Sequence, residues 1–311
     1  MPTRPTLRLA RALGALAALL AAGGAAAQGF GHGLPPPARP LHVRLAAADV
    51  VALGAVERVE TGRIAVSGAH ALRGEPGARF HIKRAPSRAP ELAPGERALW
   101  LLRGARDPYV LVDEPRELVH LEDEAQEARW RAALGDLLAA EGTVAVRDVY
   151  LGWIDGPDDG LREAALGALA NRIADPLPLG AEVAVARARA ALDPARPAGV
   201  RQASATLACL EPGGTRALLS GLARPEVDPA VVRVALAWGA MQRSEGLSEA
   251  VAASLRHADV EVRRAALAVG GRMALEPGIR SALEGMAAAD ADPQLREEAR
   301  KALGRAPAGK P

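Results

Sequence analysis

The feature that most constrains this chain of 311 residues is a short pattern that recurs through its C-terminal half. In its clearest copy, residues 259–273, an aspartate is followed by an apolar residue, an arginine and an alanine-rich stretch. The arginines of the successive copies lie 39, 32, 30 and 33 residues apart, at Arg162, Arg201, Arg233, Arg263 and Arg296. This spacing fits two short helices with their turns. It therefore predicts units that stack on copies of themselves.

Composition agrees with a folded chain built from small side chains. Apolar residues make up 49% of the sequence, whereas aromatic residues make up 3%, so alanine, leucine and valine must form most of the core. The single cysteine, Cys209, excludes an internal disulfide framework and any multi-cysteine metal site.

Residues 1–28 have the parts of a secretory signal peptide in the expected order. Arg4, Arg8 and Arg11 precede an uncharged run that ends in small residues before Gln28. The alternative, an uncleaved membrane anchor, is disfavoured because the run is short and diluted by alanine and glycine. We expect an exported protein, periplasmic or secreted, that is not inserted in a membrane after cleavage.

Loss of the three arginines takes the formal charge from +2 to slightly negative, which argues against nucleic-acid binding.

Residues 29–40 are rich in glycine and proline and are expected to form a linker. The stretch 41–121 alternates short apolar runs with turn residues, which is typical of β-strands. Phe80 and Ile82 alternate with polar neighbours, so one face of the sheet should be buried and the other solvated. A meander of such strands closes most economically into a small barrel. The strands are expected at residues 49–56, 63–66, 79–83, 97–102 and 109–112.

The strand-rich segment is similar to netrin-like OB-fold domains, the class that contains the tissue inhibitors of metalloproteases. The resemblance is carried by Ala-Asp-Val-Val, Ala-Leu-Arg-Gly and Pro-Gly-Glu followed by Leu-Trp-Leu-Leu, at residues 48–51, 71–74 and 94–102. It implies an OB-like antiparallel barrel. It does not imply the inhibitory mechanism of that class, because the N-terminal cysteine and the disulfides are missing. Phe80, Trp100 and Tyr109 fit core positions better than a stacking platform for nucleic acid or sugar.

Residues 122–142 are predicted to form a connecting amphipathic helix. Trp130, Tyr150 and Trp153 gather where the barrel should meet the helical half. They could form an aromatic ligand site, but we favour a junction that seals the exposed end of the helical stack.

Residues 143–304 are predicted to form five pairs of helices, followed by a disordered tail at 305–311. The second helix of four pairs should begin at an aspartate N-cap, at Asp158, Asp228, Asp259 or Asp292. In the remaining pair Pro197 takes that position, and Asp193 lies further upstream. The first helices are expected at residues 143–153, 180–192, 215–222, 248–256 and 278–287.

The repeated pattern resembles HEAT-type repeats in their short bacterial form. The resemblance implies an all-α solenoid in which aspartates and arginines form hydrogen-bonded ladders between repeats. By this resemblance the five arginines pair with the turn aspartates, for example Arg263 with Asp259. A row of arginines could instead bind an anionic partner, but we favour the ladder because each arginine has an acid about four positions earlier.

These predictions together describe an α+β protein of several domains, with a small OB-like antiparallel β-barrel followed by a HEAT-type α-solenoid. We recognise no catalytic residues, no cofactor-binding residues and no metal site, and we expect that the chain is not an enzyme. Cys209 lies in an apolar helix, where a thiol usually acts as a small hydrophobic group. We expect a scaffold that binds a protein partner through its helical surface. The alternatives are an inhibitor or regulator of an extracytoplasmic enzyme acting through the barrel, and an enzyme of unknown type.

Overall fold

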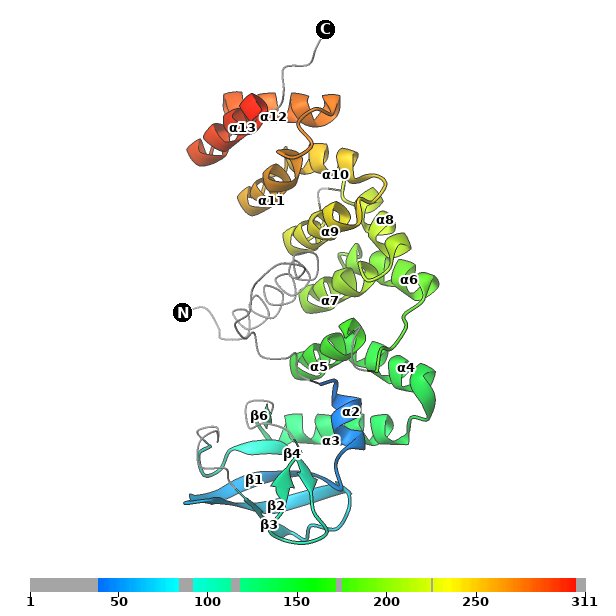
Figure 1. Ribbon diagram of the computed structural model, residues 1–311, viewed down its shortest axis with the longest axis vertical. Helices are drawn as coiled ribbons and strands as arrows, with labels where there is room; N and C mark the ends of the chain where they lie inside the picture. Colours follow the sequence, from blue (N-terminus) through cyan, green and yellow to red (C-terminus); the bar gives the residue numbers. More distant parts are fainter. Residues whose placement is uncertain (1–38, 84–91, 113–117, 172–174, 225, 306–311) are drawn as a thin grey trace, which may run out of the picture. The chain divides into compact units, whose positions relative to one another are not determined.

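The computed structural model describes residues 39–83, 92–112, 118–171, 175–224 and 226–305. The expected signal peptide, most of the expected linker and all of the tail beyond residue 305 lie outside these residues. An antiparallel sheet is followed by a series of helices, as the sequence predicts (Figure 1). The strands are β1 (Val50–Glu60), β2 (Arg63–Arg73), β3 (Arg79–Lys83), β4 (Arg97–Arg103), β5 (Val110–Leu111) and β6 (Val119–Leu121).

A short helix, α2 (Leu41–Ala46), precedes the sheet, and the sequence reasoning missed it. Pro40 lies at its N-cap, and Leu41 and Leu45 are buried one helical turn apart. The helix packs against α3 (Glu124–Ala139) and α5 (Asp159–Ala170). The segment before the sheet therefore belongs to the packing of the helical half.

The sheet is a curled antiparallel half-barrel with the strand order β3-β2-β1-β4-β5, and β6 also pairs with β4. Its two edges meet at one point, where Ile82 of β3 bridges Tyr109 just before β5. The Tyr109 N–H donates to the His81 carbonyl and the Tyr109 carbonyl accepts from the Lys83 N–H, both at 2.8 Å. These bonds satisfy edge groups that would otherwise be open to another chain.

The expectation of one buried and one solvated sheet face holds for β3 but is wrong for β1 and β4. In β3, Phe80 and Ile82 are buried between exposed or half-buried neighbours. In β1 residues 50–56 are buried or half-buried and in β4 residues 98–102 are buried, because these parts of the strands are covered on both sides; residues 57–60 of β1 are exposed or half-buried. One face packs inside the curl, where the Trp100 indole donates to the Gly54 carbonyl at 3.0 Å.

The opposite face of the central strands forms a shared core with the helices. Leu53 and Leu99 belong to the same buried cluster as Trp130 and Leu134 of α3. Above this layer Arg97 of β4 donates to the buried Glu127 of α3 at 2.6 Å, which gives the carboxylate a partner. The sheet and the first helices are therefore joined by both apolar and polar contacts.

The helical half contains five pairs, and all five first helices and all five second helices occur where the sequence predicts them. Second helices pack on second helices and, from α6 onward, first helices on first helices, so the pairs form two layers (Figure 1). The pairs are α4 (Gly142–Asp155) with α5, α6 (Ala181–Ala191) with α7 (Ala198–Ala208), α8 (Pro212–Gly221) with α9 (Pro229–Gln242), α10 (Leu247–Ser254) with α11 (Val260–Gly270), and α12 (Pro277–Ala289) with α13 (Pro293–Arg305).

The last helix, α13, buries one side and is strongly polar on the other. Leu295 and Ala299 are fully buried, whereas Glu297, Glu298 and Arg300 are exposed. Helix α13 is therefore amphipathic.

Candidate functional site

The candidate site proposed from the sequence is the set of aspartates and arginines at the turns within the helix pairs. All four expected aspartate N-caps are confirmed. The Asp158 carboxylate accepts from the Leu161 N–H at 3.0 Å, and Asp228 accepts from Ala230 at 2.8 Å. Asp259 and Asp292 accept from the backbone in the same way. Each bond satisfies an amide at a helix start that has no partner within the helix. Pro197 caps α7 without any side-chain bond.

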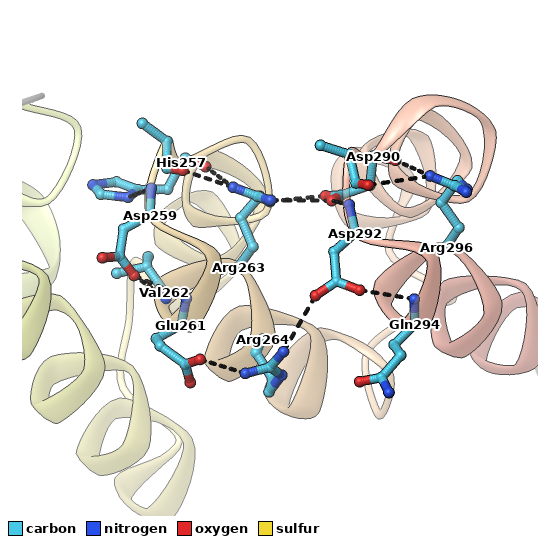
Figure 2. Close-up of polar contacts among 12 residues, drawn as sticks. His257, Asp259, Glu261, Val262, Arg263, Arg264, Asp290, Asp292, Gln294 and Arg296 are labelled. Atoms are coloured by element: carbon cyan, nitrogen blue, oxygen red, sulfur yellow. Dashed lines mark hydrogen bonds and ion pairs between the residues drawn. The ribbon is translucent and has the colours of Figure 1, made fainter.

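The signature arginines have a shared local role that the sequence reasoning did not identify. In four of the five, all but Arg233, the guanidinium turns back and donates to carbonyls just before its own helix, and Figure 2 shows this for Arg263 and Arg296. Arg263 donates to the carbonyls of His257 and Ala258, and Arg296 does the same with Asp290 and Ala291. Arg162 and Arg201 reach turn carbonyls five to eight residues earlier. The arginine therefore holds the turn in a fixed conformation.

Two of these arginines also reach the turn of the next unit. Arg201 donates to Asp228 at 2.9 Å and Arg263 donates to Asp290 at 2.8 Å and 3.0 Å, and in both cases 27 residues separate the partners. Arg264 reaches Asp292, the N-cap of α13, at 3.3 Å. We call these contacts the inter-unit rungs. The connecting helix contributes a similar one, because Arg129 donates to Asp158 at 3.1 Å.

The expected pairing of Arg263 with Asp259 is wrong. The Asp259 carboxylate is occupied by the amides of Glu261 and Val262, so Arg263 extends away from it to Asp290 in the following turn (Figure 2). Asp290 is nearly buried, with 5% of its side chain exposed. Burial alone would raise the pKa of Asp290, but hydrogen bonds from Arg263 and from the Asp292 N–H outweigh burial and lower it.

The inclusion of Arg233 in the ladder is also wrong. In α11 the arginine stands four residues after the N-cap, but in α9 that position is Val232, which is 1% exposed and belongs to the core. Arg233 stands one residue later. A shift of one residue rotates a side chain by about 100° on a helix, so Arg233 lies on the outer face. Its side chain makes no hydrogen bond or ion pair with any residue that the structure describes.

Arg162 differs from the other arginines as well. It pairs with Asp159 of its own helix rather than with the next unit. The next turn carries Pro197 at the N-cap, so no carboxylate stands where Asp228 stands for Arg201. The sequence already shows Pro197 in place of an acid at this turn. The role of Asp290, two residues before the N-cap, could have been suggested only by the repeated separation of 27 residues.

The aromatic side chains expected at the junction do come together. Trp130, Tyr150 and Trp153 are all buried, with ring centroids 5.1 Å apart for the pair Tyr150 and Trp153 and 6.4 Å for the two tryptophans. They lie in the shared core that joins the sheet to the first helices. The rings fill this core, as the junction interpretation requires.

Tyr150 also anchors α2 through its hydroxyl group. The hydroxyl accepts from the His42 backbone N–H at 2.9 Å and lies 3.2 Å from His42 Nδ1. Its own proton can then be donated to Nδ1, which leaves the ring proton on Nε2, 3.4 Å from the Asp175 carboxylate. Burial lowers the pKa of His42 and the Asp175 carboxylate offsets part of this shift, while burial raises the pKa of Tyr150. A neutral histidine and a neutral tyrosine fit this site best.

The single cysteine, Cys209, is buried in the core of the helical half. Burial raises the pKa of the Cys209 thiol to about 12, so the thiolate is scarce at neutral pH. Within residues 39–305, apart from the gaps named above, no three His, Cys, Asp or Glu side chains are grouped as metal ligands. None of the helices that the structure describes is long and apolar enough to cross a bilayer.

Comparisons with known proteins give no family for this chain. No family model matches it, no curated protein matches it, and no solved structure matches it. The site is therefore interpreted from its own geometry.

Proposed function

We propose that this chain is an exported, non-catalytic protein–protein interaction module whose five helix pairs are repeats of HEAT type. The observation that carries the proposal is the way the repeated aspartates and arginines are used. The aspartates cap helices, the arginines bind turn carbonyls, and the inter-unit rungs join one turn to the next. These charged groups serve the fold and hold the pairs in register. Partner binding then takes place on the outer surfaces of the helix pairs.

Support for stacked repeats comes from the recurrence of the same contacts at a fixed sequence separation. Arg201 with Asp228 and Arg263 with Asp290 are similar contacts with the same separation of 27 residues, although Asp228 is an N-cap and Asp290 stands two residues before one. Repeat proteins are stabilised by each unit and by its interface with the next, and they use their extended surfaces to bind partners. A scaffold of this kind needs no reactive group.

The test is affinity capture with the mature chain, residues 28–311, from an extracytoplasmic fraction. Deleting the sheet or the helices would expose their shared core, so single surface substitutions are the better probes. Three exposed apolar side chains lie on three different surfaces. Met241 is on a second helix and 50% exposed, Val144 is on a first helix and 58% exposed, and Val110 is on the sheet and 48% exposed. Each is replaced by glutamate, and unchanged circular dichroism confirms the fold of each variant.

The proposal expects a partner whose capture is lost with Met241→Glu or Val144→Glu and retained with Val110→Glu. Loss with Val110→Glu alone would support a regulator acting through the sheet instead. A chain that captures no partner and turns over a substrate would contradict the proposal. Export is tested separately, because N-terminal sequencing of exported material should start at or near Gln28.

A further inference from the structure

Helix α9 differs from the other second helices because apolar side chains also cover much of its outer face. Its side chains are apolar except for Arg233 and Gln242. The inner face, with Val231, Val232 and Leu236, belongs to the core. A helix that buries one face normally carries polar residues on the other, as α13 does with Glu297 and Arg300. An apolar outer face is therefore informative.

The outer face of α9 carries four apolar side chains that we call the α9 strip: Val234, Ala237, Trp238 and Met241. Val234 and Trp238 are half-buried, with part of each side chain packed against the core, whereas Ala237 is exposed and Met241 has half of its surface exposed. Their spacing of three and four residues places them along one side of the helix. This is the spacing at which two helices pack against each other, and tryptophan and methionine are enriched in interfaces.

Three arginines lie near the strip. Arg233 lies one turn before Ala237, Arg243 follows α9 directly, and Arg272 follows α11, the helix packed beside α9. The side chains of these three arginines are exposed and have no hydrogen bond or ion pair with the described residues. The nearby acids are engaged elsewhere, since Glu261 pairs with Arg264 and Glu245 with Arg216. Helix α9 itself carries no acid.

We propose that the α9 strip is a docking site for an amphipathic helix of a partner protein, one with an aliphatic face bordered by carboxylates. This inference rests on the proposed function and specifies its surface and the chemistry of its partner. The aliphatic face covers the strip, and the carboxylates pair with Arg233, Arg243 and Arg272. A membrane surface fits less well, because the inner face of α9 is fixed in the core and the strip is narrow.

The test uses a designed peptide of about 18 residues with leucine at helical spacing and glutamate on both flanks. A matched peptide carries lysine in place of every glutamate. Binding is followed by NMR of the mature chain labelled at the methionine methyl groups. Met241 reports on the strip, and Met286, which is 4% exposed, is an internal reference. The acidic peptide should shift the Met241 signal, leave Met286 unchanged and bind roughly tenfold more tightly than the lysine peptide.

Met241→Glu should weaken binding of the acidic peptide by roughly tenfold or more, and Val144→Glu should leave it unchanged. Equal binding of the two peptides, or no response at Met241, would overturn the proposal. A Met241 response to phosphatidylserine vesicles without one to the acidic peptide would assign the strip to a membrane. Self-association that Met241→Glu abolishes would assign it to a second copy. A captured natural partner that is insensitive to Met241→Glu would refute the strip while leaving the proposed function intact.

Discussion

Arg263 and Arg233 show that a shift of one residue along a helix decides which contacts an arginine makes. Both follow an aspartate cap and an apolar residue, and from the sequence they look alike. Arg263 lies four residues after its cap and reaches two carbonyls and Asp290, whereas Arg233 lies five residues after its cap and faces outward. The caps could be predicted because they are local. The partners of the arginines depend on which turn comes next in space.

The contrast between these arginines gives a paired prediction. Arg263→Ala leaves the nearly buried Asp290 without its cationic partner, so we expect the free energy of unfolding to fall by ~1 to 3 kcal/mol. Arg233→Ala removes an exposed side chain with no partner among the described residues and should change it by less than about 0.5 kcal/mol. Urea denaturation of both variants measures the difference. Equal effects would show that the inter-unit rung contributes nothing specific.

His42 gives a pH-dependent prediction at the same scale. Its pKa in the folded state is lowered, so the unfolded chain binds the proton more readily. Stability should therefore fall as the pH drops below the ordinary histidine value of about 6.5 and should stop falling below the lowered pKa. The groups that face the ring are Tyr150 and Asp175, and Asp175 offsets part of the effect.

The control for His42 is His42→Asn, which keeps a hydrogen-bond acceptor near the Nδ1 position but does not titrate. Thermal unfolding of both proteins between pH 7 and pH 5 isolates the contribution of this ring from that of the other histidines. The original chain should lose more stability than the variant. Parallel curves would mean that His42 is solvated and that α2 is not anchored as described.

At the scale of elements, the helices were more predictable than the contacts between them. The five pairs follow from apolar spacing and from caps, which are properties of a few neighbouring residues. Helix α2 was missed because only two of its residues are buried leucines, and β6 because three residues carry no periodicity. The sequence does indicate that small side chains let helices approach closely, and Gly214 of α8 illustrates this.

Neighbouring glycines in α8 test that close approach. A Cβ atom on Gly214 would lie 2.2 Å from the Ala208 carbonyl oxygen, whereas on Gly213 the nearest atom would be 3.9 Å away. Gly214→Ala should destabilise the protein by about 1 to 3 kcal/mol, because backbone must move to make room. Gly213→Ala should be neutral or should stabilise by up to about 1 kcal/mol through helix propensity. Chemical denaturation measures the free energy of unfolding of both variants. Equal changes in the two variants would contradict the close packing at Gly214.

At the scale of the whole molecule, the main difference from expectation is the continuity between sheet and helices. Strand alternation predicted a barrel with a wet outer face, but Leu53 and Leu99 pack against Trp130 and Leu134. A strand covered on both faces is continuously apolar, and residues 50–56 of β1 and 98–102 of β4 are such apolar runs. What covers the second face is a non-local property, so the sequence could not identify α3 as the partner.

The central claim is that the helix pairs are stacked units, each supported by its neighbours. The most direct measurement is hydrogen exchange of the mature chain with and without Leu283→Ala, which creates a cavity at a fully buried position in α12. We predict faster exchange in α10 to α13 and unchanged exchange in the sheet and in α3 to α5, because a repeat contacts only its neighbours. A uniform increase over residues 41–305 would contradict this account and would indicate a single cooperative bundle.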